Sequence, residues 1–152
     1  MKYALLLISF LYFFTSCKDT VSYQEQLDID FVKIDAYLAE KGLTAQKTAS
    51  GLYYIHTLDG TGEKPGPYST VTVGYKGYFL NGEVFDETSP GAWAQFNVSG
   101  VVPGFGEALQ LLKKKGRGTF LLPSGLAYGA SGSGSIDPNT PLIFDLELVD
   151  FY

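Results

Sequence analysis

The chain has few of the side chains that most enzymes use as nucleophiles, acid–base groups or metal ligands. Its 152 residues include one cysteine, Cys17, and one histidine, His56. Nucleophilic triads, histidine-based acid–base pairs and zinc sites each need several such side chains close together. Ordinary nucleophilic, acid–base and metal catalysis therefore have little to work with here, and we expect neither a metal nor any other cofactor.

Positive charge is also scarce. The chain has 11 lysines and arginines against 16 acidic residues, a formal net charge of −5, and it loses one more positive charge if Lys2 is removed with the N-terminus. A long basic face of the kind that binds nucleic acid is therefore not expected. We interpret Lys113–Lys115, the one basic run, as the solvated end of a helix.

A long hydrophobic run is missing as well. The longest, Ala4–Phe14, has 11 residues, too few to span the ~30 Å hydrocarbon core of a membrane as a helix. With Lys2 before it, the run predicts a secretory signal peptide over residues 1–16. Thr15-Ser16-Cys17 then resembles the end of a bacterial lipoprotein signal, with Cys17 as the lipidated first residue of the mature protein.

Such a lipid on Cys17 would hold the protein on a membrane of the cell envelope, with its folded part facing the periplasm or the cell surface. The alternatives are an uncleaved membrane anchor and a free thiol that pairs between molecules, since Cys17 has no partner within the chain.

The remaining composition suits one folded domain. Hydrophobic residues make up 45% of the chain and aromatic residues 15%, enough for a single core. The 18 glycines and 7 prolines lie mostly between short apolar runs, as in tight turns that join strands. We divide the chain into a signal peptide (1–16), a tether with an N-terminal helix (17–50) and one domain (51–152).

An amphipathic helix is expected over residues 24–41. Leu27, Phe31, Ile34 and Leu38 follow one another at spacings of four, three and four, which is one face of a helix. Gly42 is a typical helix end. The apolar face has two candidate partners, the following domain and a second copy of the chain.

The rest of the chain reads as short strands with one helix between them. Alternating apolar, β-branched and aromatic residues predict strands over 51–58, 71–79, 83–86, 94–98, 117–123 and 142–151. Asn81-Gly82 predicts a two-residue type I′ hairpin. Residues 104–115 predict the helix, with Glu107 in its first turn and three lysines in its last. These elements indicate an α+β fold, an antiparallel sheet packed on a short helix.

Five segments of this pattern recur together in one protein family. They are Tyr75-Lys76-Gly77, Val84-Phe85-Asp86, Val102-Pro103-Gly104-Phe105, Ala127-Tyr128-Gly129 and Ile143-Phe144-Asp145. In this order, over Gly51–Tyr152, they resemble the FK506-binding-protein (FKBP) family of peptidyl-prolyl cis-trans isomerases. The resemblance implies an FKBP-like antiparallel β-sheet of five or six strands wrapped around a short α-helix, here preceded by the N-terminal amphipathic helix.

The resemblance also implies a pocket for a proline ring. Its catalytic residues would be Tyr75, Phe85, Asp86, Tyr128 and Phe144, and its further substrate-binding residues Val101, Val102, Phe105, Ile136 and Trp93. Tyr75, Phe85 and Phe144 would form the walls and Phe105 the floor.

Hydrogen bonds would orient the peptide in this pocket. The hydroxyl of Tyr128 and the backbone N–H of Ile136 or its neighbour would bind peptide carbonyls, and Asp86 would orient Tyr75 at the rim. Trp93 would compensate for Ala94, which stands where the family often has an aromatic residue.

An apolar pocket suits the reaction that the resemblance implies. Rotation about an Xaa-Pro bond faces a barrier of ~18–20 kcal/mol because amide resonance must be broken, and no bond is made or cut. The planar amide has more charge separation than the twisted one, so removing it from water raises the ground state relative to the transition state.

Two functions remain open. The first is a lipid-anchored prolyl isomerase that acts on proline-containing exported proteins and binds FK506-like macrolides. The second is a non-catalytic, proline-binding chaperone or assembly lipoprotein. Phe105, where the family usually has tryptophan, and a shortened Phe96–Val101 segment leave room for the second function and for weaker macrolide binding.

Overall fold

The computed structural model describes residues 21–152. The predicted signal peptide, 1–16, and the predicted lipidation site, Cys17, lie outside the described residues. The elements are, in chain order, α1 (Tyr23–Lys41), β1 (Gln46–Lys47), β2 (Tyr53–Leu58), β3 (Thr70–Phe79), β4 (Val84–Glu87), β5 (Ala94–Asn97), η1 (Val98–Gly100), α2 (Pro103–Leu111), β6 (Arg117–Leu122), η2 (Ser124–Leu126), η3 (Gly129–Ser131) and β7 (Leu142–Phe151).

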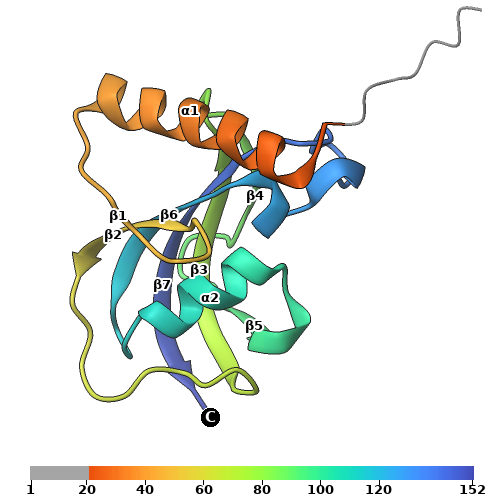
Figure 1. Cartoon of the computed structure of the whole chain (residues 1–152). Coiled ribbons are helices and arrows are strands. Elements are labelled where there is room, and N and C mark those ends of the chain that lie inside the picture. The colour runs from red at the N-terminus through yellow and green to blue at the C-terminus, as the bar shows by residue number, and fades with distance from the viewer. Residues whose placement is uncertain (1–20) are drawn as a thin grey trace, which may run out of the picture.

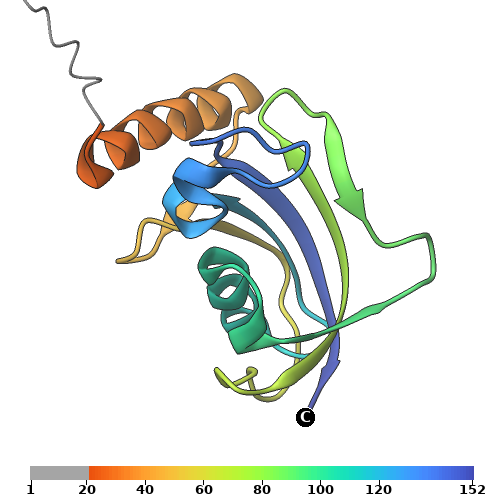
Figure 2. The ribbon, with the colours of Figure 1, turned by 90° about the vertical axis from the view of Figure 1, so that its right-hand side faces the viewer.

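All strands within residues 21–152 belong to one antiparallel sheet of seven strands, in the order β1-β2-β6-β7-β3-β4, with β5 also paired to β3. The sheet curves around α2, and α1 crosses its upper end (Figures 1 and 2). The predicted α+β fold is therefore confirmed. The seventh strand, β1, has only two residues and forms by pairing with Tyr53 and Tyr54 of β2, so no local pattern could announce it.

The two helices cover opposite faces of the sheet. Tyr54, Phe120 and Phe144 are paired across neighbouring strands, and their face packs on α2 in a core that includes Phe105 and Leu109. Side chains alternate along a strand. Their neighbours Tyr53, Leu121 and Ile143 point to the other face, where they form a second core with Ile34 and Leu38 of α1.

Helix α1 ends where its sequence predicts and begins one residue earlier than predicted, after a cap that sequence reasoning missed. The Ser22 side chain accepts a hydrogen bond from the Glu25 N–H, and the Glu25 carboxylate accepts one from the Ser22 N–H, which makes a capping box. At the other end Gly42 is left-handed, with φ 63°. Of the two partners expected for its apolar face, the structure shows the domain itself.

Within residues 21–152 no helix is both long and apolar enough to cross a membrane.

Helix α2 is shorter than predicted. It ends at Leu111, and Leu112 is already extended with ψ 146°. The residues that follow form hydrogen bonds with distant parts of the backbone. The Lys114 carbonyl accepts one from the Thr61 N–H, and the Lys115 N–H donates one to the Leu148 carbonyl. Lys113–Lys115 is thus part of the turn between α2 and β6 and not the last turn of a helix. The prediction was wrong because these long-range hydrogen bonds replace the last helical turn.

The hairpin between β3 and β4 also differs from the type I′ prediction. Among its residues only Gly82 has a positive φ, 89°, whereas type I′ needs two such residues. The Gly82 N–H donates to the Phe79 carbonyl and the Phe79 N–H to the Glu83 carbonyl, both at 2.9 Å. This is a three-residue loop in which Gly82 forms a bulge, an arrangement that also places glycine after a turn.

Candidate functional site

An aromatic pocket lies between α2 and the concave face of the sheet. Its centre is Phe144 of β7, whose ring is 5.0 Å from that of Phe105 and 5.6 Å from that of Phe85. The Phe105 ring is in turn 6.0 Å from that of Tyr75. All three pairs meet edge to face, the geometry that aromatic quadrupoles favour. Strands β3, β4 and β7 and helix α2 thus each contribute one ring to the pocket.

Phe96 of β5 is a further wall that sequence reasoning missed. Its ring is 5.7 Å from that of Tyr75 and 5.7 Å from that of Phe105. The missed signal is the alternation of β5, because Ala94 and Phe96 share one face of that strand. Although Ala94 is not aromatic, the same strand therefore still supplies an aromatic side chain to the pocket, that of Phe96.

These residues enclose a cavity of about 340 Å³. It is lined by Tyr75, Phe85, Asp86, Phe96, Gly100, Val101, Val102, Phe105, Tyr128 and Phe144. Every residue of the predicted site except Ile136 and Trp93 is among them. Phe105 and Phe144 are only 4% exposed, so the fold holds these two rings rigidly.

At the rim of the pocket a tyrosine and a carboxylate are paired. The Tyr75 hydroxyl donates a hydrogen bond of 2.6 Å to Asp86 Oδ2. Burial raises the pKa of Tyr75 to about 12, helped by this hydrogen bond, by the charge of Asp86 and by the neighbouring Tyr128. Tyr75 therefore keeps its proton at neutral pH and its hydroxyl points toward Asp86.

Tyr128 lies at the same rim with its side chain open to solvent. Residue Tyr128 is 36% exposed, and it follows η2 in the loop between β6 and β7. Within residues 21–152 its hydroxyl makes no hydrogen bond. The hydroxyl is therefore free to donate to a peptide carbonyl.

Of the backbone donors expected at Ile136 or its neighbour, the Ile136 N–H is already engaged. The Ile136 N–H donates to the Ser133 carbonyl at 2.8 Å, and the Ser133 N–H donates back at 2.9 Å. The Ile136 side chain is 7% exposed and belongs to the core around Phe105. The Ile136 side chain thus packs in the core and is not among the residues that line the pocket.

Val102 offers the donor that sequence reasoning missed. It lines the pocket and is the residue before α2, with Pro103 as the first helical residue. Within the described part of the chain its N–H donates no hydrogen bond, as expected at a position outside the helical ladder. The Val102-Pro103 pair was the available signal, because proline favours the first turn of a helix.

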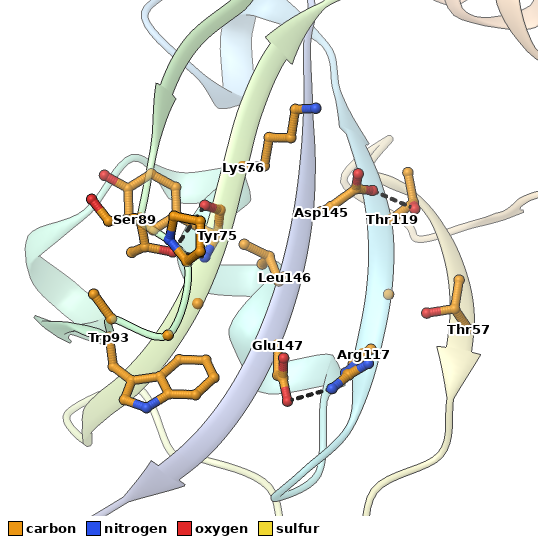
Figure 3. Close-up of a pocket in the computed structure, with 16 residues that line it drawn as sticks. Thr57, Tyr75, Lys76, Ser89, Trp93, Arg117, Thr119, Asp145, Leu146 and Glu147 are labelled. Carbon is orange, nitrogen blue, oxygen red and sulfur yellow. Dashed lines mark hydrogen bonds and ion pairs between the residues drawn. The ribbon is translucent and has the colours of Figure 1, made fainter.

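Trp93 lies on the other face of the sheet, and its expected role in the pocket is corrected. Its ring packs against Gly74 and borders a wider, shallow hollow of about 510 Å³ (Figure 3). Two pairs of polar side chains in this hollow are joined to each other. Arg117 contacts Glu147 at 2.8 Å, and the Thr119 hydroxyl donates to Asp145 at 2.6 Å.

Trp93→Ala is expected to leave kcat/KM for a proline peptide within about twofold of the wild type, because the side chain is half exposed and outside the aromatic pocket. A peptide isomerisation assay on the two proteins checks this. A loss of about tenfold or more would return Trp93 to the substrate site.

Between residues 21 and 152 no three histidine, cysteine, aspartate or glutamate side chains gather in a way that could hold a metal ion. His56 is exposed at the end of β2, with its ring 5.3 Å from that of Tyr54.

The fold and the site together define a class, an α+β protein whose antiparallel sheet wraps a short helix and encloses an aromatic binding pocket. The family model "FKBP-type peptidyl-prolyl cis-trans isomerase" matches residues 61–149. The chain therefore belongs to the FKBP family, as the five sequence segments predicted.

Individual relatives agree. A Neisseria meningitidis serogroup B protein named "Probable FKBP-type peptidyl-prolyl cis-trans isomerase FkpA" is 43% identical over 121 residues, covering 77% of this chain and 44% of that protein. "Outer membrane protein MIP" of Legionella longbeachae is 39% identical over 138 residues, covering 87% of this chain and 58% of that protein. The chain thus spans about half the length of these curated relatives.

A solved structure gives the same result in three dimensions. The crystal structure of FkpA from Escherichia coli matches with a TM-score of 0.73 and 34% identity. The match covers 84% of this chain and 62% of that one. The shared fold therefore extends beyond residues 61–149.

Proposed function

We propose that this protein is a peptidyl-prolyl cis-trans isomerase that accelerates rotation about Xaa-Pro bonds. The observation that carries the proposal is the aromatic pocket, with Phe144 and Phe105 at its centre and the paired Tyr75 and Asp86 at its rim. Membership of an isomerase family supports the same activity.

The pocket would act on the amide in two ways. Its rings would hold the proline and take the amide out of water, which disfavours the planar, more polar ground state. The Tyr128 hydroxyl and the Val102 N–H would bind peptide carbonyls and hold the chain while the bond turns. A reduction of the barrier by about 5 kcal/mol would give an acceleration of several thousandfold.

Exchange NMR on a short Xaa-Pro peptide tests the activity. With catalytic amounts of protein, the cis and trans signals should interconvert far faster than in the peptide alone, whose exchange takes tens to hundreds of seconds. Peptide binding without faster exchange would instead support the second candidate, a non-catalytic, proline-binding chaperone or assembly lipoprotein. The phenyl ring of Phe105 at the pocket floor, which has no N–H donor, is the feature that favours this second candidate.

The activity should depend little on pH. Rotation of an amide transfers no proton, so kcat/KM is expected to stay constant from about pH 6 to pH 9. The raised pKa of Tyr75, about 12, keeps its hydroxyl protonated throughout this range. A bell-shaped profile centred near neutral pH would contradict the proposal, because it would reveal a proton-transferring group.

The same pKa predicts a loss of stability at high pH. Because the pKa of Tyr75 is higher in the folded protein than its ordinary value of about 10, the unfolded chain releases this proton first. The contribution of Tyr75 to the free energy of unfolding is therefore complete below about pH 10 and disappears as the pH rises through about 12. Denaturation monitored at several alkaline pH values measures it.

Residues 51–152 are proposed to be the isomerase domain, following a tether and helix over 17–50 and a signal peptide over 1–16. We also propose that Cys17 is lipidated and holds the domain on a membrane of the cell envelope, in the periplasm or at the cell surface. The 11-residue apolar run and Thr15-Ser16-Cys17 support this, as does the name of the Legionella relative. Intact mass spectrometry of the mature N-terminus tests it, and an unmodified Cys17 would refute it.

Proline-containing segments of exported proteins are the proposed substrates, and FK506-like macrolides the proposed inhibitors. Because Phe105 has a smaller ring than tryptophan and no N–H, we expect weak macrolide binding. Phe105→Trp should strengthen it. Titration of both proteins with one macrolide compares the two affinities, and equal affinities would show that Phe105 is not the reason.

A further inference from the structure

Helix α1 carries a buried carboxyl group that reaches the loop of the pocket. Asp30 is fully buried, at 0% exposure, in the face of α1 that packs on the domain. One of its oxygens accepts a 2.7 Å hydrogen bond from the Ser124 N–H, and the other accepts a 2.9 Å bond from Gln26 Nε2. A buried carboxyl is costly unless it is hydrogen-bonded, so these two contacts account for its presence.

Ser124 is the first residue of the short helix η2, which leads directly to Tyr128. Within η2 and its ends the Leu126 N–H donates to the Pro123 carbonyl and the Ala127 N–H to the Ser124 carbonyl, both at 2.9 Å. Fixing the Ser124 N–H therefore fixes the start of the segment that ends at Tyr128. Asp30 caps η2 in the way that an aspartate caps a longer helix.

The segment has little rigidity of its own. Helix η2 has only three residues, and glycines lie within it and after Tyr128, where Gly129 has a φ of 58°. Side chains that pack on the segment from two sides restrict its movement. The ring of Tyr23 on α1 packs on Gly125, and Leu126 packs on Gly104 of α2.

We propose that Asp30 is a positioning residue of the isomerase site, which places the Tyr128 hydroxyl at the pocket by holding the Ser124 N–H. Helix α1 is then part of the active machinery, although it lies before residues 61–149, which match the family. This inference rests on the proposed isomerase function.

Two substitutions at Asp30 separate the hydrogen bond from the rest of the side chain. Asp30→Ala removes the acceptor and should lower kcat/KM about tenfold, through the loss of a well-placed hydrogen bond to substrate. Asp30→Asn has nearly the same shape and keeps an oxygen that can accept from the Ser124 N–H, so it should restore most of the activity.

Leu38→Ala is the matched control for damage to the helix. Leu38 is buried on the same face of α1, about 12 Å along the helix from Asp30, and packs with Tyr53 and Leu121 rather than with η2. The variant should lose thermal stability and, measured below its melting temperature, keep the wild-type kcat/KM. An equal loss of activity in Leu38→Ala and Asp30→Ala would overturn the proposal.

A double-mutant cycle with Tyr128→Phe tests whether Asp30 acts through Tyr128. If it does, Asp30→Ala should lower kcat/KM in the wild type but change it by less than about twofold when the Tyr128 hydroxyl is already absent. Effects that multiply would overturn the proposal. A purely structural role gives no such dependence on one hydroxyl.

Gln26→Ala keeps the test informative if Asp30→Ala does not fold. It removes one of the two hydrogen bonds to Asp30 and should lower kcat/KM by about twofold to threefold, again only when Tyr128 is present. If Gln26→Ala folds and keeps the wild-type kcat/KM while the separate Tyr128→Phe variant is inactive, the positioning role is contradicted. Wild-type protein that does not accelerate exchange at all would refute the isomerase function itself, a separate outcome.

Discussion

Phe144→Ala is expected to lower kcat/KM by about a hundredfold and the free energy of unfolding by about 3–5 kcal/mol. Phe144 is 4% exposed and touches the rings of both Phe105 and Phe85. Its loss would join the pocket to a new cavity and let water reach the amide, which weakens the desolvation on which the mechanism depends.

Phe120→Ala is the matched control for this prediction. Phe120 is the partner of Phe144 on the adjacent strand and on the same face of the sheet, and it is completely buried but does not line the pocket. Its truncation should cost a similar free energy of unfolding, about 3–5 kcal/mol, with little change in kcat/KM for the folded protein. Chemical denaturation and the isomerisation assay give both values, and equal losses of activity would refute the pocket.

Gly77→Ala is expected to reduce both stability and activity although it adds only one methyl group. A Cβ at Gly77 would lie 2.6 Å from the Phe85 ring and 2.8 Å from the Phe144 ring, far inside van der Waals contact. Overpacking of this kind costs about 1–3 kcal/mol. Because both rings line the pocket, moving them should also lower kcat/KM by about tenfold or more.

Gly74→Ala on the same strand is the comparison. There the added Cβ would lie 2.7 Å from Trp93, but on the opposite face and against a half-exposed ring that can rotate away. We expect a small change in the melting temperature and a normal kcat/KM. If Gly74→Ala were the more damaging of the two, the pocket would not explain the glycine in Tyr75-Lys76-Gly77.

Local patterns explain which elements could be predicted. Strand β3 follows from side-chain alternation, and helix α1 from an apolar stripe that ends at a glycine. Both patterns depend on residues a few positions apart. The end of α2 could not be predicted, because it depends on a hydrogen bond that Lys114 accepts and one that Lys115 donates, both shared with residues far away in the chain.

The candidate site divides in the same way. The family segments include Tyr75, Phe85, Asp86, Phe105, Tyr128 and Phe144, and all six line one cavity. Phe96 and the Val102 N–H were missed because their contribution depends on the direction in which a strand and a helix end face. Trp93 was assigned to the pocket as the neighbour of Ala94, and Ile136 was assigned from the family resemblance. The sheet instead directs Trp93 to its other face, and the loop between β6 and β7 turns Ile136 into the core.

Periodicity and short segments in a set order were enough to predict six of the seven strands, the presence of both α-helices and the family. The contacts between the rings, the N–H groups left free and the hydrogen bond from Ser124 to Asp30, 94 residues apart, are visible only in three dimensions. The physical reason is that burial and hydrogen bonding depend on every element packed around a group, and no local pattern records those neighbours.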